Sequence, residues 1–258
     1  MQKDSAGKTL LVAVLLCIVC SLMVTSSAVI LRDKQETNKQ LDIKKNLLLA
    51  CGLLTNPKAS EQEILKAYQA VQGEVIDLAT GEVSKDFDIE SFDQRKMSKN
   101  PIYNHSIPNN KDSAGIKIRS KYALAYKVQQ EGEPPMIVLP IHGKGLWSTL
   151  YGFLALASDT RTIKGIGFYE HAETPGLGGE VDNPQWKQQW VGKTALDENY
   201  QPIFRVNKGT VTNSTPNHQN KVDGLSGATI TSNGVTGFVQ YWLGEDGFGP
   251  YLAKLRNL

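Results

Sequence analysis

The feature that most constrains this chain is an uninterrupted apolar run near its N-terminus. Thr9–Leu31 contains no charged residue, no Pro and no Gly, and charges flank it at Lys8 and Arg32. As a helix, the run would be about 34 Å long at about 1.5 Å per residue, enough to cross a hydrocarbon core of about 30 Å. A cleaved signal peptide is the alternative, but its apolar core usually has only about 7–15 residues. We therefore predict a retained transmembrane helix over residues 9–31.

The charges beside this run do not settle its orientation. Two lysines precede it, whereas five basic residues follow it closely: Arg32, Lys34, Lys39, Lys44 and Lys45. The positive-inside rule would leave the following domain in the cytoplasm, but large domains are often translocated regardless of flanking charge. The orientation stays open on the charges alone.

Composition excludes several classes of function. The formal net charge is +2, and no Lys/Arg block is interleaved with aromatic residues, which argues against nucleic-acid binding. Cys17 and Cys20 lie three apart within the apolar run, where cysteine is typical as a small apolar residue of a membrane helix. Cys51 is the only other cysteine, so this chain alone builds neither a disulfide framework nor a four-cysteine metal centre.

The spacing of residues after the apolar run predicts that the helix continues beyond it. Arg32–Leu54 lacks Pro and carries Leu41, Lys44, Lys45 and Leu48 at helical spacing, until Asn56-Pro57 stops it. We predict a connecting helix over 32–56, followed by one domain over 57–258. Ser60–Glu63 forms a capping box, so a helix should follow with Ile64, Leu65, Tyr68 and Val71 on one face.

The remaining pattern predicts an α+β fold. Residues 86–110 are polar and favour an irregular segment; Asp86, Asp88 and Glu90 lack the Gly of a calcium loop, and we predict no metal site. Short apolar or alternating runs predict four strands: 123–128, 136–141, 150–157 and 163–169. Helices should begin at Asn183-Pro184 and cover Ser232–Leu243. Without regular β-α alternation there is no Rossmann sheet, so we expect a mostly antiparallel sheet flanked by helices.

The common nucleotide-binding, metal-binding and nucleophile motifs are absent from the sequence. Gly143-Lys144-Gly145 is followed by Leu-Trp-Ser, which fits neither a dinucleotide fingerprint nor a P-loop. The four histidines, His105, His142, His171 and His218, are scattered and lack metal-ligand spacing. No Gly-x-Ser-x-Gly elbow is present.

Two segments carry the remaining chemical signal. Asp223–Ser232 joins small residues and clustered hydroxyls just before a helix, whose free N–H groups and partial positive charge suit a phosphate. A turn that merely caps the helix explains the same composition. In Glu173–Gly179, three glycines allow close approach to a flat ligand, Thr174 can hydrogen-bond and Leu177 can cover a ring. On composition alone, a simple surface turn is the favoured interpretation of that segment.

A resemblance distinguishes these interpretations. Asp223–Thr231 resembles the flavinylation motif Asp-Gly-x-Ser/Thr-Gly-Ala-Thr-x-Ser/Thr of flavin mononucleotide (FMN)-carrying bacterial membrane proteins. The whole chain is similar to the C subunit of the sodium-translocating NADH:quinone reductases. Further matching stretches are Gly145–Ser148, Glu173–Glu180, Trp190–Lys193, Trp242–Gly244 and Gly247–Pro250. The G subunit of the ion-translocating ferredoxin:NAD reductases shares the flavin motif but fits the other stretches less well.

The resemblance implies an attachment site and its maturation. A flavin transferase would cleave FAD and leave one covalent FMN, as a phosphoester, on Thr229. Ser226, Gly227 and Ala228 complete the attachment loop, and Asp223, Gly224 and Thr231 would serve recognition by the transferase. We expect the ring to rest against two further segments, in which the candidate contacts are Leu146, Trp147, Ser148, Thr174, Gly176, Leu177 and Gly178.

The resemblance also implies a cellular role. The chain would be an electron relay in a multi-subunit complex of the bacterial inner membrane that oxidises NADH, reduces ubiquinone and exports sodium, with the domain over 57–258 in the periplasm. This orientation goes against the charge count. A membrane-anchored binding module without redox work is the alternative from a different functional class.

Overall fold

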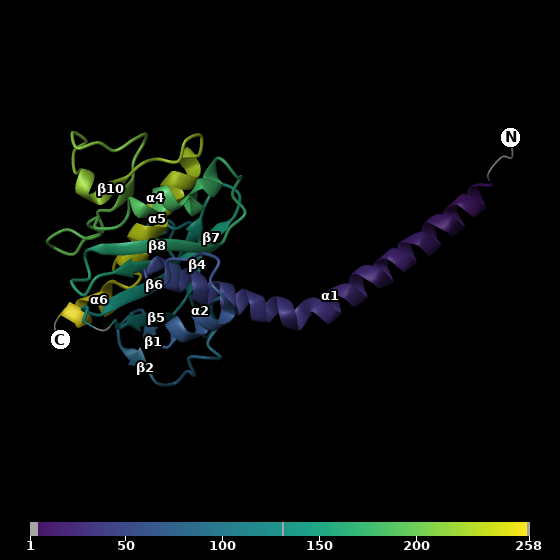
Figure 1. Cartoon of the computed structure of the whole chain (residues 1–258), viewed down its shortest axis with the longest axis horizontal. Helices are drawn as coiled ribbons and strands as arrows, with labels where there is room; N and C mark the ends of the chain where they lie inside the picture. Colours follow the sequence, from purple (N-terminus) through teal and green to yellow (C-terminus); the bar gives the residue numbers. More distant parts are fainter. Residues whose placement is uncertain (1–4, 131, 257–258) are drawn as a thin grey trace. The chain divides into compact units, whose positions relative to one another are not determined.

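The computed structural model describes residues 5–130 and 132–256, and it divides into two compact units, Met1–Ile43 and Lys44–Leu258 (Figure 1). The helix α1 (Ala6–Ala50) runs through the first unit and supplies the beginning of the second. It is long and apolar enough to cross a membrane, by length and composition. The large apolar side chains from Leu10 to Leu31 are 46–75% exposed, so this part of α1 presents apolar surface to its surroundings.

The end of α1 differs from the sequence prediction. The helix stops at Ala50, whereas the connecting helix was predicted to reach residue 56. Gly52 has φ +75°, and its N–H donates to the carbonyl of Leu49 at 3.3 Å. A left-handed glycine with this back-reaching hydrogen bond is a standard helix terminator. Gly52 therefore ends the helix before Asn56-Pro57 is reached.

The second unit continues with α2 (Glu61–Tyr68), whose predicted capping box is present. The N–H of Glu63 donates to Ser60 Oγ, and the N–H of Ser60 donates to the Glu63 carboxylate at 2.7 Å. Ile64 is its buried side chain. The predicted apolar face of this helix included Val71, but Val71 is the first residue of the strand β1 (Val71–Asp77). Because Val71 also fits the helical spacing, the strand was not predicted.

A six-stranded sheet forms the centre of this unit, in the order β2-β1-β5-β6-β7-β8, and each neighbouring pair is antiparallel. The further strands are β2 (Val83–Ser84), β5 (Tyr122–Val128), β6 (Met136–Lys144), β7 (Thr149–Leu156) and β8 (Ile163–Glu170). The four predicted strands correspond to β5 through β8. The sheet and its helices confirm the predicted α+β class.

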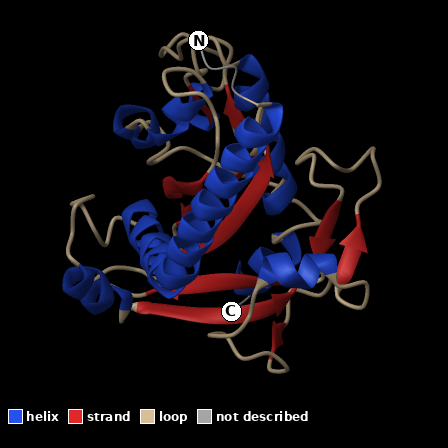
Figure 2. Cartoon of the chain, turned by 90° about the vertical axis from the view of Figure 1, so that its right-hand side faces the viewer, coloured by secondary structure: helices blue, strands red, loops and turns tan. Residues whose placement is uncertain are grey.

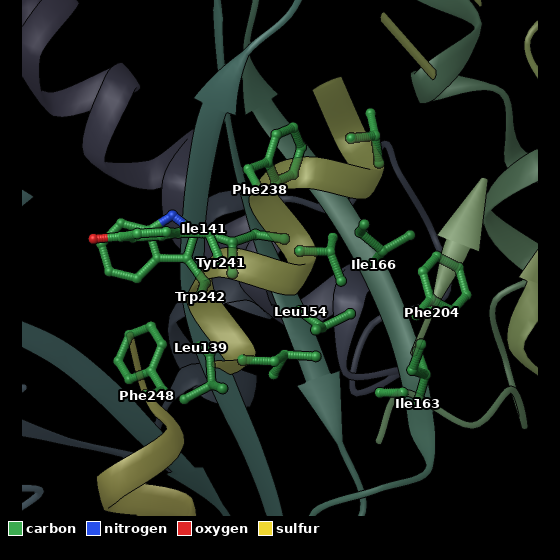
Figure 3. Close-up of a cluster of buried hydrophobic side chains, with 14 of the residues drawn as sticks. Leu139, Ile141, Leu154, Ile163, Ile166, Phe204, Phe238, Tyr241, Trp242 and Phe248 are labelled. Atoms are coloured by element: carbon green, nitrogen blue, oxygen red, sulfur yellow. The ribbon is translucent and has the colours of Figure 1, made fainter. Parts of the chain in front are cut away.

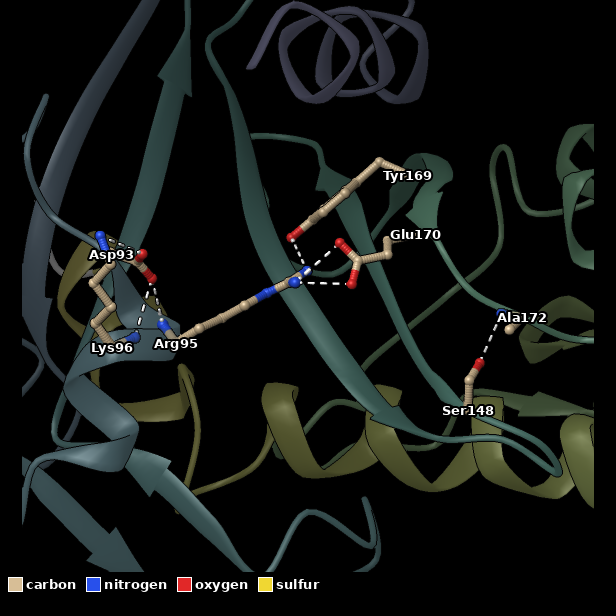
Figure 4. A network of polar contacts seen from close by, with 7 residues as sticks. All are labelled: Asp93, Arg95, Lys96, Ser148, Tyr169, Glu170 and Ala172. Atoms are coloured by element: carbon tan, nitrogen blue, oxygen red, sulfur yellow. Dashed lines mark hydrogen bonds and ion pairs between the residues drawn. The ribbon is translucent and has the colours of Figure 1, made fainter. Parts of the chain in front are cut away.

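The segment predicted to be irregular is in part ordered. It contains α3 (Gln94–Lys99) and β3 (Asn104–Ser106), and β3 pairs with β4 (Ile118–Ser120). Asp93 caps α3 by accepting from the N–H groups of Arg95 and Lys96. In Figure 4, Arg95 reaches both carboxylate oxygens of Glu170 on β8, each at 2.9 Å. This segment is ordered by polar contacts with distant residues and by strand pairing, neither of which produces an apolar periodicity. The sequence pattern therefore did not predict its helix and strand.

Helices lie against the sheet (Figure 2). The helix α5 (Thr229–Leu243) packs on β6, where Leu139 and Ile141 join Phe238 and Trp242 in the main core (Figure 3). A Cβ at Gly143 of β6 would lie 2.3 Å from Phe238 Cβ, so glycine permits this close approach.

The opposite face of β8 receives the last turn of α1. Gly165 and Gly167 alternate along the strand with the core residues Ile166 and Phe168, and neighbouring residues of a strand point to opposite faces. A Cβ at Gly165 would lie 2.2 Å from the carbonyl oxygen of Ala50. The sheet is therefore packed on both faces.

The remaining elements are short. They are α4 (Pro184–Gln188), α6 (Gly249–Arg256), the 3-10 helices η1 (Gly178–Asp182) and η2 (His218–Asn220), and the parallel pair β9 (Arg205–Val206) and β10 (Lys221–Val222). Asn183 caps α4, where a helix was predicted to begin. The helix α5 starts at Thr229, three residues before its predicted start at Ser232, so the threonine singled out in the motif is the first residue of the helix.

Candidate functional site

The three segments predicted to form the site meet around one carboxylate. They are the turn Gly145–Ser148 between β6 and β7, the loop after β8 that contains Glu173, and the start of α5. Glu173 is only 5% exposed. Its Oε1 accepts from the N–H groups of Trp147 at 2.9 Å and Ser148 at 3.2 Å. Its Oε2 accepts from the N–H of Leu146 at 3.3 Å and from Thr231 Oγ1 at 2.6 Å.

The surroundings of Glu173 favour its charged form. Burial raises the pKa of this carboxyl, but the Thr231 hydroxyl and the three backbone N–H groups outweigh burial and lower the pKa below its usual value. Glu173 is therefore a buried anion at neutral pH, and its four donors supply the hydrogen bonds that a buried charge requires.

Two glycines leave space for this carboxylate. A Cβ at Gly145 would lie 2.6 Å from Glu173 Oε1. A Cβ at Gly178 would lie 2.6 Å from Glu173 Oε2 and 2.8 Å from Thr231 Oγ1. Contacts this short do not occur with real side chains, so both positions require glycine while Glu173 stays in place. Gly178 of the predicted loop and Gly145 of the neighbouring turn thus make room for a protein carboxylate.

Thr229 lies at an open helix end. It is exposed, it is the first residue of α5, and within the described chain no side chain caps this N-terminus. Ser226 and Gly227 are also exposed, whereas Ala228 is buried. The first N–H groups of a helix have no partner within it, and they carry a partial positive charge. The Thr229 hydroxyl therefore stands where a phosphate would meet unpaired donors.

The start of α5 touches the glycine-rich loop. Gly227 has φ +69°, which favours glycine, and a Cβ there would lie 2.8 Å from Leu177 Cδ2. Thr174 is exposed, and its carbonyl accepts from the N–H groups of Leu177 and Gly179. Gly176 has φ +76° at the tip of this turn. The structure thus brings together two segments that lie some fifty residues apart and that the sequence analysis assigned to one site.

Asp223 fixes the loop that precedes α5. Its carboxylate accepts from the N–H of Val211 at 2.6 Å and from Gln189 Nε2 at 3.0 Å, and its N–H donates to Gln189 Oε1. Trp186 Nε1 donates to the carbonyl of Asp223 at 2.8 Å. A Cβ at Gly224 would lie 2.4 Å from the Asn207 carbonyl oxygen. Asp223 and Gly224 therefore determine the path of the loop toward Thr229.

Large apolar side chains are exposed on the converging segments. Trp147 is 68% exposed and Ile230 is 58% exposed, while Leu146 and Leu177 are each 43% exposed. Ser148 differs, because its Oγ accepts from the N–H of Ala172 at 2.8 Å and so ties the turn to the loop after β8 (Figure 4). Apolar surface beside an uncapped helix N-terminus is chemically suited to the two parts of a flavin nucleotide, its flat ring and its anionic tail.

Comparisons with known proteins identify the family of this chain. The FMN-binding domain family matches residues 145–244, a range that includes all three converging segments. The chain is 43% identical to the C subunit of the Na(+)-translocating NADH-quinone reductase of Pseudomonas aeruginosa, over 99% of this chain and 98% of that protein. The chain belongs to the C-subunit family of Na(+)-translocating NADH-quinone reductases. The C subunit of Yersinia pestis is likewise 43% identical, over 99% of this chain and 95% of that protein.

Solved structures of the C-subunit family share the fold. Shewanella oneidensis NqrC is 34% identical with a TM-score of 0.78, and the match covers 86% of this chain and all of that one. The C subunit from Parabacteroides distasonis is 25% identical with a TM-score of 0.67, over 86% of this chain and 96% of that one. These matches support the architecture that carries the site.

Three residues of this site were not predicted to take part in it. Glu173 was the first residue of the glycine-rich segment and of a matching stretch but was given no role, yet the three segments converge on its carboxylate. A charged residue directly before a glycine-rich loop was the available signal. Gln189, which holds Asp223, and Ile230, which is exposed beside Thr229, carried no sequence signal of their own.

Proposed function

We propose that this chain carries one FMN, joined by its phosphate to the hydroxyl of Thr229, and that it relays electrons within a Na(+)-translocating NADH:ubiquinone reductase. One observation carries the assignment: Thr229 is an exposed residue at the N-terminus of α5, where no side chain of the described chain caps the helix. Ester formation leaves an anionic phosphodiester, which the free N–H groups of this first turn would hold.

The residues present fit the rest of the cofactor. Leu146, Trp147, Leu177 and Ile230 are exposed on the segments that meet at Glu173, and they would cover a flat ring and exclude water from it. Thr174 and Gly176 are exposed and offer polar backbone and close approach at the same loop, whereas Gly178 is buried against Glu173 and serves the protein interior. The tether keeps the ring at a high effective concentration near these contacts. FMN supplies the electron chemistry, and the protein orients it and sets its environment.

Family membership supports a role within a larger assembly. The described residues contain one candidate membrane helix, and the sequence contains no Rossmann motif, so other subunits would bind NADH and conduct sodium. In this proposal the complex lies in the bacterial inner membrane and couples NADH oxidation and ubiquinone reduction to sodium export. A flavin transferase would install the FMN, and Asp223, Gly224 and Thr231 would contribute to its recognition by holding the loop in shape, since Thr231 is buried and Asp223 accepts hydrogen bonds within the domain.

Two alternatives are disfavoured by specific observations. The G subunit of an ion-translocating ferredoxin:NAD reductase would carry the same motif, but identity to the C subunits extends over 99% of this chain. A membrane-anchored binding module without a cofactor would need neither an exposed threonine at an uncapped helix N-terminus nor exposed apolar side chains beside it. A relay subunit accounts for both.

Thr229→Ala tests the attachment. The full chain, coexpressed with its flavin transferase, should show a fluorescent band after denaturation, and the variant should lose it because the ester oxygen is gone. Thr210→Ala is the matched control, since Thr210 is an exposed threonine outside the motif; it should keep full fluorescence. Thr231→Ala should retain at least part of the flavin. A Thr229→Ala protein that still fluoresces after denaturation refutes the assignment.

A further inference from the structure

Glu173 links the two parts of the proposed flavin site. Three of its donors belong to the turn that carries Leu146 and Trp147, and the fourth is the hydroxyl of Thr231, two residues after the attachment threonine. Thr231 is fully buried, so its hydroxyl faces the protein interior. One side chain therefore ties the ring-side turn to the first turn of α5.

We infer that Glu173 is the positioning residue of the flavin site, and that its fixed negative charge lowers the reduction potential of the flavin. The inference rests on the proposed function. It assigns to Glu173 the alignment of the turn Gly145–Ser148 with the start of α5, so that ring and attachment point are held in one geometry. Glu173 acts through these neighbours and has no part in attachment chemistry.

The positioning role follows from the strength and direction of the contacts. Hydrogen bonds to a charged acceptor are shorter and roughly twice as strong as neutral ones, and the 2.6 Å contact from Thr231 belongs to this class. A carboxylate that accepts from three successive N–H groups fixes the orientation of those peptides. Gly145 and Gly178 have no side chain that would displace the carboxylate from this position.

The effect on potential follows from charge. Reduction adds electron density to the ring, and a nearby buried anion repels it in surroundings that screen poorly. Protein charges near a flavin are among the groups that tune its electronics. Glu173 accepts from the backbone of the turn whose side chains are candidate ring contacts, so removing its charge should make reduction easier.

Glu173→Gln, made in the full-length, transferase-treated chain, tests both the positioning role and the effect on the reduction potential. The variant should still carry covalent flavin, because Thr229 is unchanged. Its midpoint potential should shift to more positive values, and the visible circular dichroism of the flavin should change because the ring-side turn is released. Glu198→Gln is the matched control, since it removes the same charge at an exposed position; both readouts should stay at the wild-type values.

Variants of Thr231 distinguish the positioning role of Glu173 from the effect of its charge. Thr231→Val keeps the charge of Glu173 and its three backbone donors but removes the link to α5. It should alter the flavin dichroism and shift the potential less than Glu173→Gln does. Thr231→Ser restores the hydroxyl and should restore the wild-type dichroism. A residue that served only global stability would change the melting temperature without this pattern.

The outcomes are distinguishable. Glu173→Gln with wild-type loading, dichroism and potential overturns the inference. If that variant does not fold, Thr231→Val decides: wild-type dichroism in Thr231→Val overturns the positioning role, and altered dichroism restored in Thr231→Ser supports it. Absence of covalent flavin from the wild-type chain would instead refute the proposed function.

Discussion

At the scale of single residues, two threonines of one motif have opposite environments. Thr229 is exposed, whereas Thr231 is buried and donates to Glu173. Two positions along a helix correspond to about 200° of rotation, at about 3.6 residues per turn, so the side chains point to nearly opposite sides. The helix thus presents Thr229 at the surface and uses the Thr231 hydroxyl to hold its first turn in place.

Leu177 provides a residue-scale test of the ring pocket. Leu177→Lys should leave the ester at Thr229 intact but change ring solvation, and with it the flavin absorption spectrum and the midpoint potential. A shift of about 60 mV in a one-electron step corresponds to about 1.4 kcal/mol. Spectroelectrochemical titration of the loaded full chain measures both quantities.

Leu65→Lys is the matched control, because Leu65 has the same exposed fraction of 43% but lies on α2. Its spectrum and potential should equal those of the wild type. Should Leu177→Lys also match the wild type in spectrum, potential and electron-transfer rate, the glycine-rich loop is not the pocket, and Trp147 becomes the leading ring contact.

At the scale of elements, glycines within α5 determine how closely the helix approaches its neighbours. A Cβ at Gly234 would lie 2.2 Å from the carbonyl oxygen of Lys144, and one at Gly237 would lie 2.1 Å from that of Ser113. Glycine costs about 1 kcal/mol relative to alanine inside a helix. The close packing of α5 against backbone explains why glycine nevertheless occupies both positions.

Gly234→Ala should therefore destabilise the domain, although alanine is the better helix former. Overpacking typically costs about 1–3 kcal/mol, which equals or exceeds the propensity gain of about 1 kcal/mol. The clash is with the end of β6, so flavin loading should fall as well. Thermal unfolding followed by circular dichroism measures the loss.

Asn233→Ala is the matched control for this packing test, because Asn233 is the adjacent, exposed position on α5. Alanine has a higher helix propensity than asparagine, so this variant should unfold at the wild-type temperature or slightly above. A Gly234→Ala protein more stable than the wild type would contradict the packing described.

Sequence patterns predicted elements where one face is buried and failed where pairing is irregular. The apolar and alternating runs located β5 through β8 because these strands supply much of the buried core. The same approach missed β1, because Val71 also fits the helical stripe of α2, and it missed α3, which lacks buried side chains among its described residues. The motif singled out Thr229 as the candidate attachment residue, whereas the position of Glu173 between three segments depends on contacts between distant parts of the chain that no local pattern encodes.

At the scale of the whole molecule, the two units have different surface requirements. The first part of α1 exposes apolar side chains, whereas the second unit buries its apolar residues in a sheet-centred core. Only an apolar environment stabilises the former, which supports a membrane anchor. The basic residues that follow the span argue for a cytoplasmic domain, and the family resemblance argues for a periplasmic one.

A reporter fused after Lys34 tests this topology. We expect alkaline phosphatase to be active at that point, because the enzyme folds only in the periplasm, and N-terminal sequencing of the membrane-extracted protein should begin near Met1. A fusion before Thr9 should be inactive as the paired control. Strong activity of a cytoplasmic reporter after Lys34 would reverse the proposed orientation and uphold the charge count.

The packing of the last turn of α1 against β8 also has a consequence for biosynthesis. Ala50 leaves the ribosome long before Gly165 and Gly167, the two glycines that make room for it. The anchor can thus enter the membrane while its own final turn still lacks the surface on which it packs. That turn carries Leu47 and Leu48, which are buried in the folded domain. This nascent segment would need shielding, by a chaperone or by the bilayer surface, during synthesis.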